Sequence, residues 1–248
     1  MVKMPVDERQ LSYTSTRTDI ANIVPGNALN ILDVGCSNGA LGKHLKSLVA
    51  GRKVFGIEYD TVFADMASCS LDSVVKADVN TLDWHSVFDD QEFDCLIFAD
   101  VLEHLANPEQ CLSLALQRLV PGGYVIVSLP NVRHISALWS IFFRGTFPRR
   151  DRGIFDRTHL RWFTYADAKG LLHERGLRVS SESFALRWRD QGGGHFNRIL
   201  NRLPFAVQRL ALVREFLTYQ VCFRAEATTL AAQPFGRTDH LIAKQSRH

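Results

Sequence analysis

Two acids and a histidine follow one apolar run at close spacing. Asp100, Glu103 and His104 occupy positions i, i+3 and i+4 in FADVLEHL, so on a helix they would share one face. Carboxylates and imidazoles together can take a proton from an acceptor group or bind a divalent cation. His159, in DRTHLRWFT, adds a second imidazole. We expect these four residues to form a catalytic group or a metal site; the alternative is that Glu103 and His104 only shape a pocket.

A glycine-containing segment, ILDVGCSNGALGKHL, is the second feature with chemical meaning. An apolar run ends in Asp33, passes Gly35 and Gly39, and enters a helical pattern. Glycines at such a junction let the backbone turn sharply and let a ligand lie against main-chain amides. The segment therefore predicts a ligand-binding loop with Asp33 beside it.

Two further acids indicate the kind of ligand. Glu58 ends the next apolar run and Asp78 follows the third. In a parallel sheet these positions meet at one edge, where Glu58 could accept both hydroxyls of a ribose and Asp78 a proton of the adenine amine. Ser37 stands where a dinucleotide fold needs its second glycine, and the sequence has no G-x-x-x-x-G-K-S/T phosphate loop. The pattern favours a nucleoside without phosphates, and S-adenosylmethionine fits.

The elements that must position these residues follow from the apolar periodicity. Short apolar runs alternate with helical patterns, which is typical of a parallel sheet with crossover helices. Strands are predicted at residues 30–34, 53–57, 73–77, 93–99, 124–129, 177–184 and 218–225. Helical patterns cover residues 39–49, 61–68, the segment after Pro108, and 164–175, and residues 196–212 are amphipathic. The fold class is therefore α/β, a Rossmann-like, mostly parallel seven-stranded sheet with helices on both faces.

The second half of the chain carries an insertion of unusual composition. Residues 132–163, after the fifth strand, are rich in arginine and aromatic residues, and residues 144–161 alone have a net charge of +4. Aromatic rings can stack on a sugar or base while arginines hold phosphates, so we expect an acceptor-side lid. The substrate-binding residues predicted there are Arg133, Arg150, Arg157, Arg161 and Trp162. The alternatives are a solvated loop whose aromatics plug the core, and a membrane-surface segment in ALWSIFFRGTFPRR.

Composition and charge limit the class of protein. With 248 residues, 46% of them apolar and 22% charged, a largely disordered chain is excluded. No apolar run reaches membrane-spanning length, the N-terminus does not resemble a secretory signal, and five cysteines without a C-x-x-C pair favour a reduced cytoplasm. Residues 1–130 carry a net charge of −8 and residues 131–248 one of +11, so we expect the second half to meet an anionic acceptor. We expect a leader over residues 1–28, one domain over 29–226 and a loose tail over 227–248.

The ordered motifs resemble the class I S-adenosylmethionine-dependent methyltransferases. The resemblance rests on D-V-G-C-x-x-G, on the acids after the second and third strands, and on FDCLIFADVLEHL and LVPGGYVIVSLPN, and it covers roughly residues 10–185. This chain is similar to bacterial methyltransferases of polysaccharide and O-antigen biosynthesis in three segments, which are the leader around Arg17–Pro25, SLPNVRH and GIFDRTHLRWFT. The residues expected at the cofactor are Asp33, Gly35, Cys36, Gly39, Glu58, Tyr59, Asp78, Val79, Phe98 and Ala99.

The resemblance also suggests a reaction. It implies O-methylation of a sugar hydroxyl in polysaccharide or glycoconjugate biosynthesis; the alternatives are an RNA ribose end, a quinone-type small molecule, or a non-catalytic module that only binds S-adenosylmethionine. The set Asp100, Glu103, His104 and His159 is similar to the E-x-x-E-H and distal histidine metal site of small-RNA 2′-O-methyltransferases, although Asp100 is one methylene shorter than glutamate. We expect S-adenosylmethionine as cofactor, with a divalent metal as a further candidate. The expected location is the cytoplasm, with peripheral contact at the inner membrane face.

Overall fold

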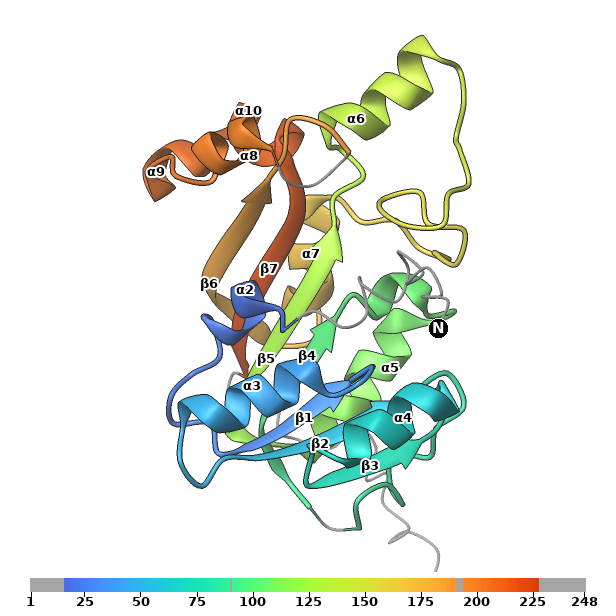
Figure 1. Cartoon of the computed structure of the whole chain (residues 1–248), viewed down its shortest axis with the longest axis vertical. Coiled ribbons are helices and arrows are strands. Elements are labelled where there is room, and N and C mark those ends of the chain that lie inside the picture. The colour runs from blue at the N-terminus through green and yellow to red at the C-terminus, as the bar shows by residue number, and fades with distance from the viewer. Residues whose placement is uncertain (1–15, 90, 191–193, 228–248) are drawn as a thin grey trace, which may run out of the picture.

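A seven-stranded sheet forms the centre of the molecule, with strand order β3-β2-β1-β4-β5-β7-β6 (Figure 1). The computed structural model describes residues 16–89, 91–190 and 194–227. The strands are β1 (Asn30–Val34), β2 (Lys53–Glu58), β3 (Ser73–Lys76), β4 (Phe93–Ala99), β5 (Leu119–Pro130), β6 (Leu177–Leu186) and β7 (Thr218–Ala227). Strands β1 to β5 pair in parallel, while β7 is antiparallel to both β5 and β6. The predicted fold class is confirmed.

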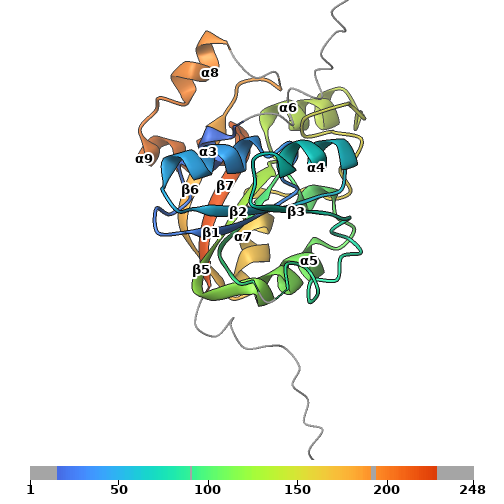
Figure 2. The same ribbon diagram turned by 60° about the horizontal axis from the view of Figure 1, so that its bottom comes forward.

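Helices cover both faces of this sheet, as Figure 2 shows. On one face lie α2 (Thr18–Ala21), α3 (Ala40–Leu48) and α4 (Thr61–Ser68), and on the other α5 (Pro108–Ala115) and α7 (Tyr165–His173). Because side chains alternate along a strand, neighbouring residues enter different cores: Ile31 and Ile97 pack with α2, α3 and α4, whereas Leu32 and Leu96 pack with α5 and α7. Two apolar layers therefore hold the sheet and fix where its strands end.

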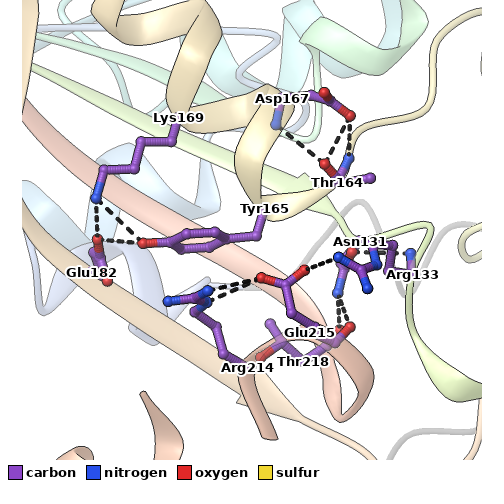
Figure 3. A network of polar contacts seen from close by, with 10 residues as sticks. All are labelled: Asn131, Arg133, Thr164, Tyr165, Asp167, Lys169, Glu182, Arg214, Glu215 and Thr218. Carbon is purple, nitrogen blue, oxygen red and sulfur yellow. Dashed lines mark hydrogen bonds and ion pairs between the residues drawn. The ribbon is translucent and has the colours of Figure 1, made fainter. Parts of the chain in front are cut away.

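The start of α7 is capped by a reciprocal pair of hydrogen bonds. The Thr164 hydroxyl accepts from the Asp167 amide at 3.2 Å, and the Asp167 carboxylate accepts from the Thr164 amide at 3.1 Å (Figure 3). This reciprocal pair satisfies two amides that the first turn of a helix leaves without partners. It sets the point at which the insertion ends and regular structure resumes.

Two segments take a form that the sequence did not specify. The run 196–212, predicted only as amphipathic, contains or overlaps three short helices: α8 (His195–Leu200), α9 (Phe205–Gln208) and α10 (Ala211–Phe216). Pro204 lies at the break between the first two, where its missing N–H and its ring are incompatible with a continuing helix. Strand β5 starts at Leu119, five residues before the predicted start, and carries the P-G-G turn within its bounds.

The insertion after β5 contains little regular structure. A short helix α6 (Ile135–Leu138) continues as a π-helical turn η3 (Trp139–Phe143), and an irregular path leads on to Thr164. The predicted tail lies outside the described residues apart from its first position, and the predicted leader is described from Thr16 onward. Among the described helices, none combines the length and the apolar character that crossing a bilayer requires.

Candidate functional site

The loop between β1 and α3 has the sharp turn that its glycines predict. Gly35 and Gly39 have φ angles of 72° and 77°. A Cβ on Gly35 would lie 2.6 Å from Val101 Cγ2, so a side chain there would be both strained and in collision. Ser37, at the position of the missing glycine, also adopts a left-handed conformation with φ 50°. Serine therefore takes the backbone shape that a glycine would take more easily.

Glu58 supports this loop from the end of β2. One oxygen of its carboxylate accepts from the Ser37 amide at 2.8 Å, and the other accepts from the Asp60 amide at 2.9 Å. The side chain is buried, and neighbouring Tyr59 is exposed. Glu58 thus lies at the same edge as the glycine loop, as the sequence predicts.

Asp33 is a buried acid at the end of β1. Burial, and then the negative charge of Glu58, raise the pKa of Asp33 to about 7, although Arg17 acts in the opposite direction. Cys36, beside it, is also buried, and burial raises the pKa of its thiol. Cys36 Sγ fills the space beside Gly56, where an added Cβ would lie only 2.5 Å away. Asp33 is therefore the group of this loop whose charge changes near neutral pH, and Cys36 is a packing residue.

Asp78 and Val79 follow β3 at the same edge. The Asp78 carboxylate is exposed and accepts from the amide and the side chain of Asn80, both at 2.9 Å. The side-chain Oδ1 of Asn80 in turn accepts from the Ala106 amide at 3.0 Å. This chain of contacts connects the end of β3 to the turn after β4. Phe98 and Ala99 end β4, which lies between β1 and β5. All ten predicted cofactor residues therefore lie in loops or at strand ends on the carboxyl side of the sheet.

Glu103, His104 and His159 form a compact group beyond the end of β4. One ligand atom of each lies within 4.8 Å of the others, and the two imidazole rings meet edge to face with centroids 4.7 Å apart. Glu103 and His104 belong to a short 3₁₀ turn, η1 (Leu102–His104). The amides of Leu160 and Arg161 donate to the Glu103 carbonyl at 2.8 and 3.0 Å, which fixes the insertion, and with it His159, against η1.

The hydrogen bonds of the two histidines determine which nitrogens remain available. His159 Nδ1 lies 3.1 Å from the Ile154 carbonyl, and His104 Nδ1 lies 3.3 Å from the Thr158 carbonyl. Because a carbonyl can only accept, we assign the proton of each neutral ring to Nδ1, which leaves a lone pair on Nε2. Burial and the neighbouring His104 lower the pKa of His159 and favour its neutral form. Two proton acceptors, or two metal ligands, therefore stand side by side.

Glu103 is the least solvated member of this group. Its side chain is 1% exposed, and its Oε2 has no hydrogen-bond partner among the described residues. Burial, and then the charge of Asp100, raise the pKa of Glu103 well above its usual range. An orphaned buried carboxylate oxygen is costly, so it fits a role in which a proton or a cation satisfies it.

Asp100 does not share a helical face with Glu103 and His104, and that prediction is wrong. The chain leaves β4 through Asp100 in a left-handed conformation, φ 59°, and continues as a 3₁₀ turn instead of an α-helix. The Asp100 carboxylate instead forms an ion pair with Arg17 and accepts a hydrogen bond from Nε2 of the Gln220 side chain. The ligand atoms that converge are those of the other three predicted residues.

Arg17 is a site residue that the sequence analysis missed. It lies just before α2, pairs with Asp19 at 2.9 Å as well as with Asp100, and donates to Ser128 Oγ at 2.9 Å. Burial alone would lower the pKa of this guanidinium, but Asp100 and Asp19 more than offset it and raise the pKa. The sequence signal was the leader around Arg17, which resembled the family without indicating what the arginine touches.

The predicted substrate-binding residues of the insertion all have partners within the chain. Arg133 pairs with Glu215 at 3.0 Å, and Figure 3 shows Glu215 placed between Arg133 and Arg214. The others bind as follows: Arg150 to Asp190, Arg157 to Asp151 at 2.6 Å, Arg161 to the Ala106 carbonyl at 2.5 Å, and Trp162 Nε1 to the Ile154 carbonyl at 3.2 Å. In this structure they hold the insertion together and connect it to neighbouring segments.

Comparison with known proteins identifies relatives. A family model described as a methyltransferase domain matches residues 8–182. The ubiquinone biosynthesis O-methyltransferase of Hydrogenovibrio crunogenus is 32% identical over 115 residues, which is 45% of this chain and 47% of the relative. The mitochondrial enzyme of the same name from Candida albicans is 28% identical over 183 residues, or 72% of this chain and 54% of the relative. The chain thus spans about half the length of the curated relatives it matches.

Solved structures share the fold at low identity. A SAM-dependent methyltransferase from Archaeoglobus fulgidus aligns with a TM-score of 0.57 and 19% identity, covering 88% of this chain and 94% of that one. The magnesium protoporphyrin IX methyltransferase of Synechocystis, solved with bound SAH, aligns with a TM-score of 0.54 and 15% identity, covering 89% and 84% of the two chains. At this identity the likeness is one of fold.

Proposed function

The chain belongs to the methyltransferase-domain family. From this premise we propose that it is an S-adenosylmethionine-dependent enzyme that methylates a hydroxyl of a phenolic, quinone-type small molecule. Two observations support this acceptor. Several relatives are named ubiquinone biosynthesis O-methyltransferases, and Glu103, His104 and His159 converge at the end of β4. The carbohydrate acceptor expected from the sequence has no support among these relatives.

The residues at the loop fit the cofactor. Asp33 and Glu58 are buried carboxyl groups, which suit a ribose and a cationic sulfonium tail and would repel phosphates. We assign the ribose hydroxyls to Glu58 and the amino-acid end of the cofactor to Asp33 and Arg17. Bound there, S-adenosylmethionine supplies an electrophilic methyl group, so this chain has to orient the acceptor and remove its proton.

The proton affinity of the acceptor favours a phenol over a sugar. A phenol with a pKa of about 10 lies only about 3.5 units above an ordinary imidazole, a gap of about 5 kcal/mol. For a sugar hydroxyl, taking water at about 15.7 as a guide, the gap is about 9 units or about 12 kcal/mol. The neutral imidazoles of His104 and His159 can therefore accept a phenolic proton as the methyl group is transferred. Removing the proton of an alcohol would need a further group that lowers the pKa of its hydroxyl.

The same three side chains fit a divalent cation. His104, His159 and Glu103 each offer one nitrogen or oxygen ligand atom within 4.8 Å of the others. The Nδ1–H groups assigned to both rings are oriented by carbonyls, as is usual for metal-binding histidines. A cation held there would lower the pKa of a bound hydroxyl. The metal site that we propose consists of Glu103, His104 and His159 and does not include Asp100.

The acceptor class can be tested by following labelled methyl groups. Purified protein with tritiated S-adenosylmethionine should label a water-soluble catechol, and a chelator should reduce the rate if Glu103, His104 and His159 hold a cation. Parallel reactions contain a methyl glycoside or a short RNA with a free 3′ end. Label in the glycoside or the RNA, with none in the catechol, would contradict the proposed acceptor and support the corresponding alternative.

Asp33 predicts a pH dependence of cofactor binding. Its folded-state pKa, about 7, lies above the value of 3.8 for a free aspartate, so the neutral acid predominates in the free protein below about pH 7. A cationic cofactor binds better to the ionised form. Affinity should therefore rise by about tenfold from one pH unit below 7 to one unit above it, in proportion to the ionised fraction. Calorimetry across this range is the measurement, and Asp33→Asn should bind more weakly and lose most of the slope; an equally steep profile in that variant would contradict the assignment.

A further inference from the structure

The first half of the insertion carries an exposed aromatic turn with basic neighbours. Phe142 and Phe143, in η3, are 76% and 74% exposed. The remaining members of this surface, which we call the tip surface, are Trp139, Ile141, Phe147, Arg144 and Arg149, all of them exposed. Large apolar side chains gathered on a surface commonly mark a site of contact with a protein or a membrane.

The connection between β6 and β7 has a second surface of the same kind. Helices α8, α9 and α10, with the turn before α10, expose Phe196, Ile199, Phe205, Leu210 and Leu212, the last at 74%. The segment between Gly194 and Leu217 contains four arginines and one glutamate, so it is positively charged. We call this the connection surface. In the part of the chain that the structure describes, no ion pair involves Arg144, Arg149, Arg198 or Arg202.

Both surfaces lie at the sheet edge that carries the candidate site. Strands β1, β4 and β5 are parallel, and β6 runs in the same direction because both β5 and β6 are antiparallel to β7. Helix α6 and η3 follow the end of β5, while α8, α9 and α10 lie between the end of β6 and the start of β7. Figure 1 shows α6 and the group α8 to α10 together at the top, beyond the arrowheads of β5 and β6. Glu103 and His104 follow the end of β4 at this same edge.

We propose that the tip surface and the connection surface dock the protein onto an anionic lipid bilayer, with the acceptor side of the site toward the lipid. Phenylalanine, tryptophan and leucine beside arginine are the composition of segments that lie in a membrane interface. The apolar side chains would enter the boundary of the acyl chains, while the arginines meet anionic headgroups. The arginines of the tip surface and the connection surface give these two surfaces the charge that complements such a bilayer. This docking is independent of which acceptor is methylated.

Vesicle flotation of the full chain tests the proposal. The protein should float with vesicles of equimolar phosphatidylcholine and phosphatidylglycerol, much less with phosphatidylcholine alone, and less as salt is added. Phe142→Ser with Phe143→Ser removes two largely exposed rings. Arg144→Glu with Arg149→Glu reverses two charges without breaking an ion pair among residues 16–89, 91–190 and 194–227. Each double variant should lower the partition coefficient by about tenfold or more, since each basic residue near an anionic surface contributes several-fold.

Matched controls lie at the opposite sheet edge. Leu48, which ends α3 and is 53% exposed, and Lys53, which begins β2 and is exposed, lie at the amino ends of the strands. Leu48→Ser and Lys53→Glu should float like the unmodified protein. Melting temperatures of all variants verify that each one folds.

Three results would overturn the docking proposal. The first is no flotation with anionic vesicles, or equal flotation with neutral ones. The second is unchanged flotation of both tip variants. The third is a dimer that Phe142→Ser with Phe143→Ser dissociates in the absence of any vesicle binding, which would assign the tip surface to a second copy of the chain. Flotation needs no methyl acceptor, so its outcome tests membrane docking independently of the catechol reaction, which tests the proposed acceptor.

Discussion

Replacing Glu58 by alanine should weaken S-adenosylmethionine binding by about 100-fold or more, because two hydrogen bonds to a charged carboxylate contribute at least about 3 kcal/mol together. The loop between β1 and α3 should also become less stable. The Ser37 amide, held by Glu58 at 2.8 Å, would lose the partner that supports its left-handed conformation. Titration calorimetry with the cofactor measures the effect.

A control variant separates loss of the ribose contact from local destabilisation. Asp60 caps α4 by accepting from the amides of Val62 and Phe63 at 2.9 and 3.1 Å. Asp60→Ala should cost about 1 kcal/mol of stability while leaving the Glu58 carboxylate in place, so cofactor affinity should fall much less. Unchanged affinity in Glu58→Ala would contradict the role assigned to Glu58.

Replacing His104 by asparagine should lower kcat by about 100-fold to 10,000-fold, the range expected when a general acid or base is removed. The asparagine amide nitrogen can take the place of Nδ1 and still donate to the Thr158 carbonyl, so the variant removes the reactive Nε2 while keeping the structural contact. Cofactor affinity should be preserved because Glu58 and Asp33 are untouched. Single-turnover rates with a saturating catechol measure the loss.

The exposed His85, in the turn before β4, provides the matched control. His85→Asn should leave kcat unchanged. Near-normal turnover in His104→Asn would remove His104 from the catalytic group. Combining His104→Asn with Glu103→Gln tests whether the two residues act as one unit. If they do, kcat of the double variant should be only slightly lower than kcat of the more impaired single variant.

Much of the cofactor edge could be predicted from the sequence for a simple physical reason. In a parallel sheet every strand points the same way, so the residues that end apolar runs must gather at one edge. Asp33, Glu58 and Asp78 each follow such a run, and the structure places all three there. Gly35 and Gly39 adopt the positive φ angles that a sharp strand–helix turn needs. These are local properties, and they required no knowledge of distant contacts.

The acceptor side depends on contacts that local patterns do not contain. The i, i+3, i+4 spacing predicted one helical face for Asp100, Glu103 and His104, but a left-handed residue followed by a 3₁₀ turn separates Asp100 from the other two. His159 joins them because amides of the insertion bind the Glu103 carbonyl. Charge counting likewise detected the basic insertion, but not that Arg150 and Arg157 are paired with acids inside the chain.

The sequence alone therefore determined where the strands of the sheet lie along the chain and which acids follow them. It also determined which cofactor those acids can hold. Both are properties of single segments, because apolar periodicity and the residue that ends a strand are local features. Only the tertiary structure decided which side chains meet across the chain. It brought His159 to Glu103, turned Asp100 toward Arg17, and left Phe142 and Phe143 exposed at the acceptor edge. Such contacts between distant residues depend on the backbone conformation of single residues and on long-range hydrogen bonds. The spacing of residues along a sequence does not encode either of them.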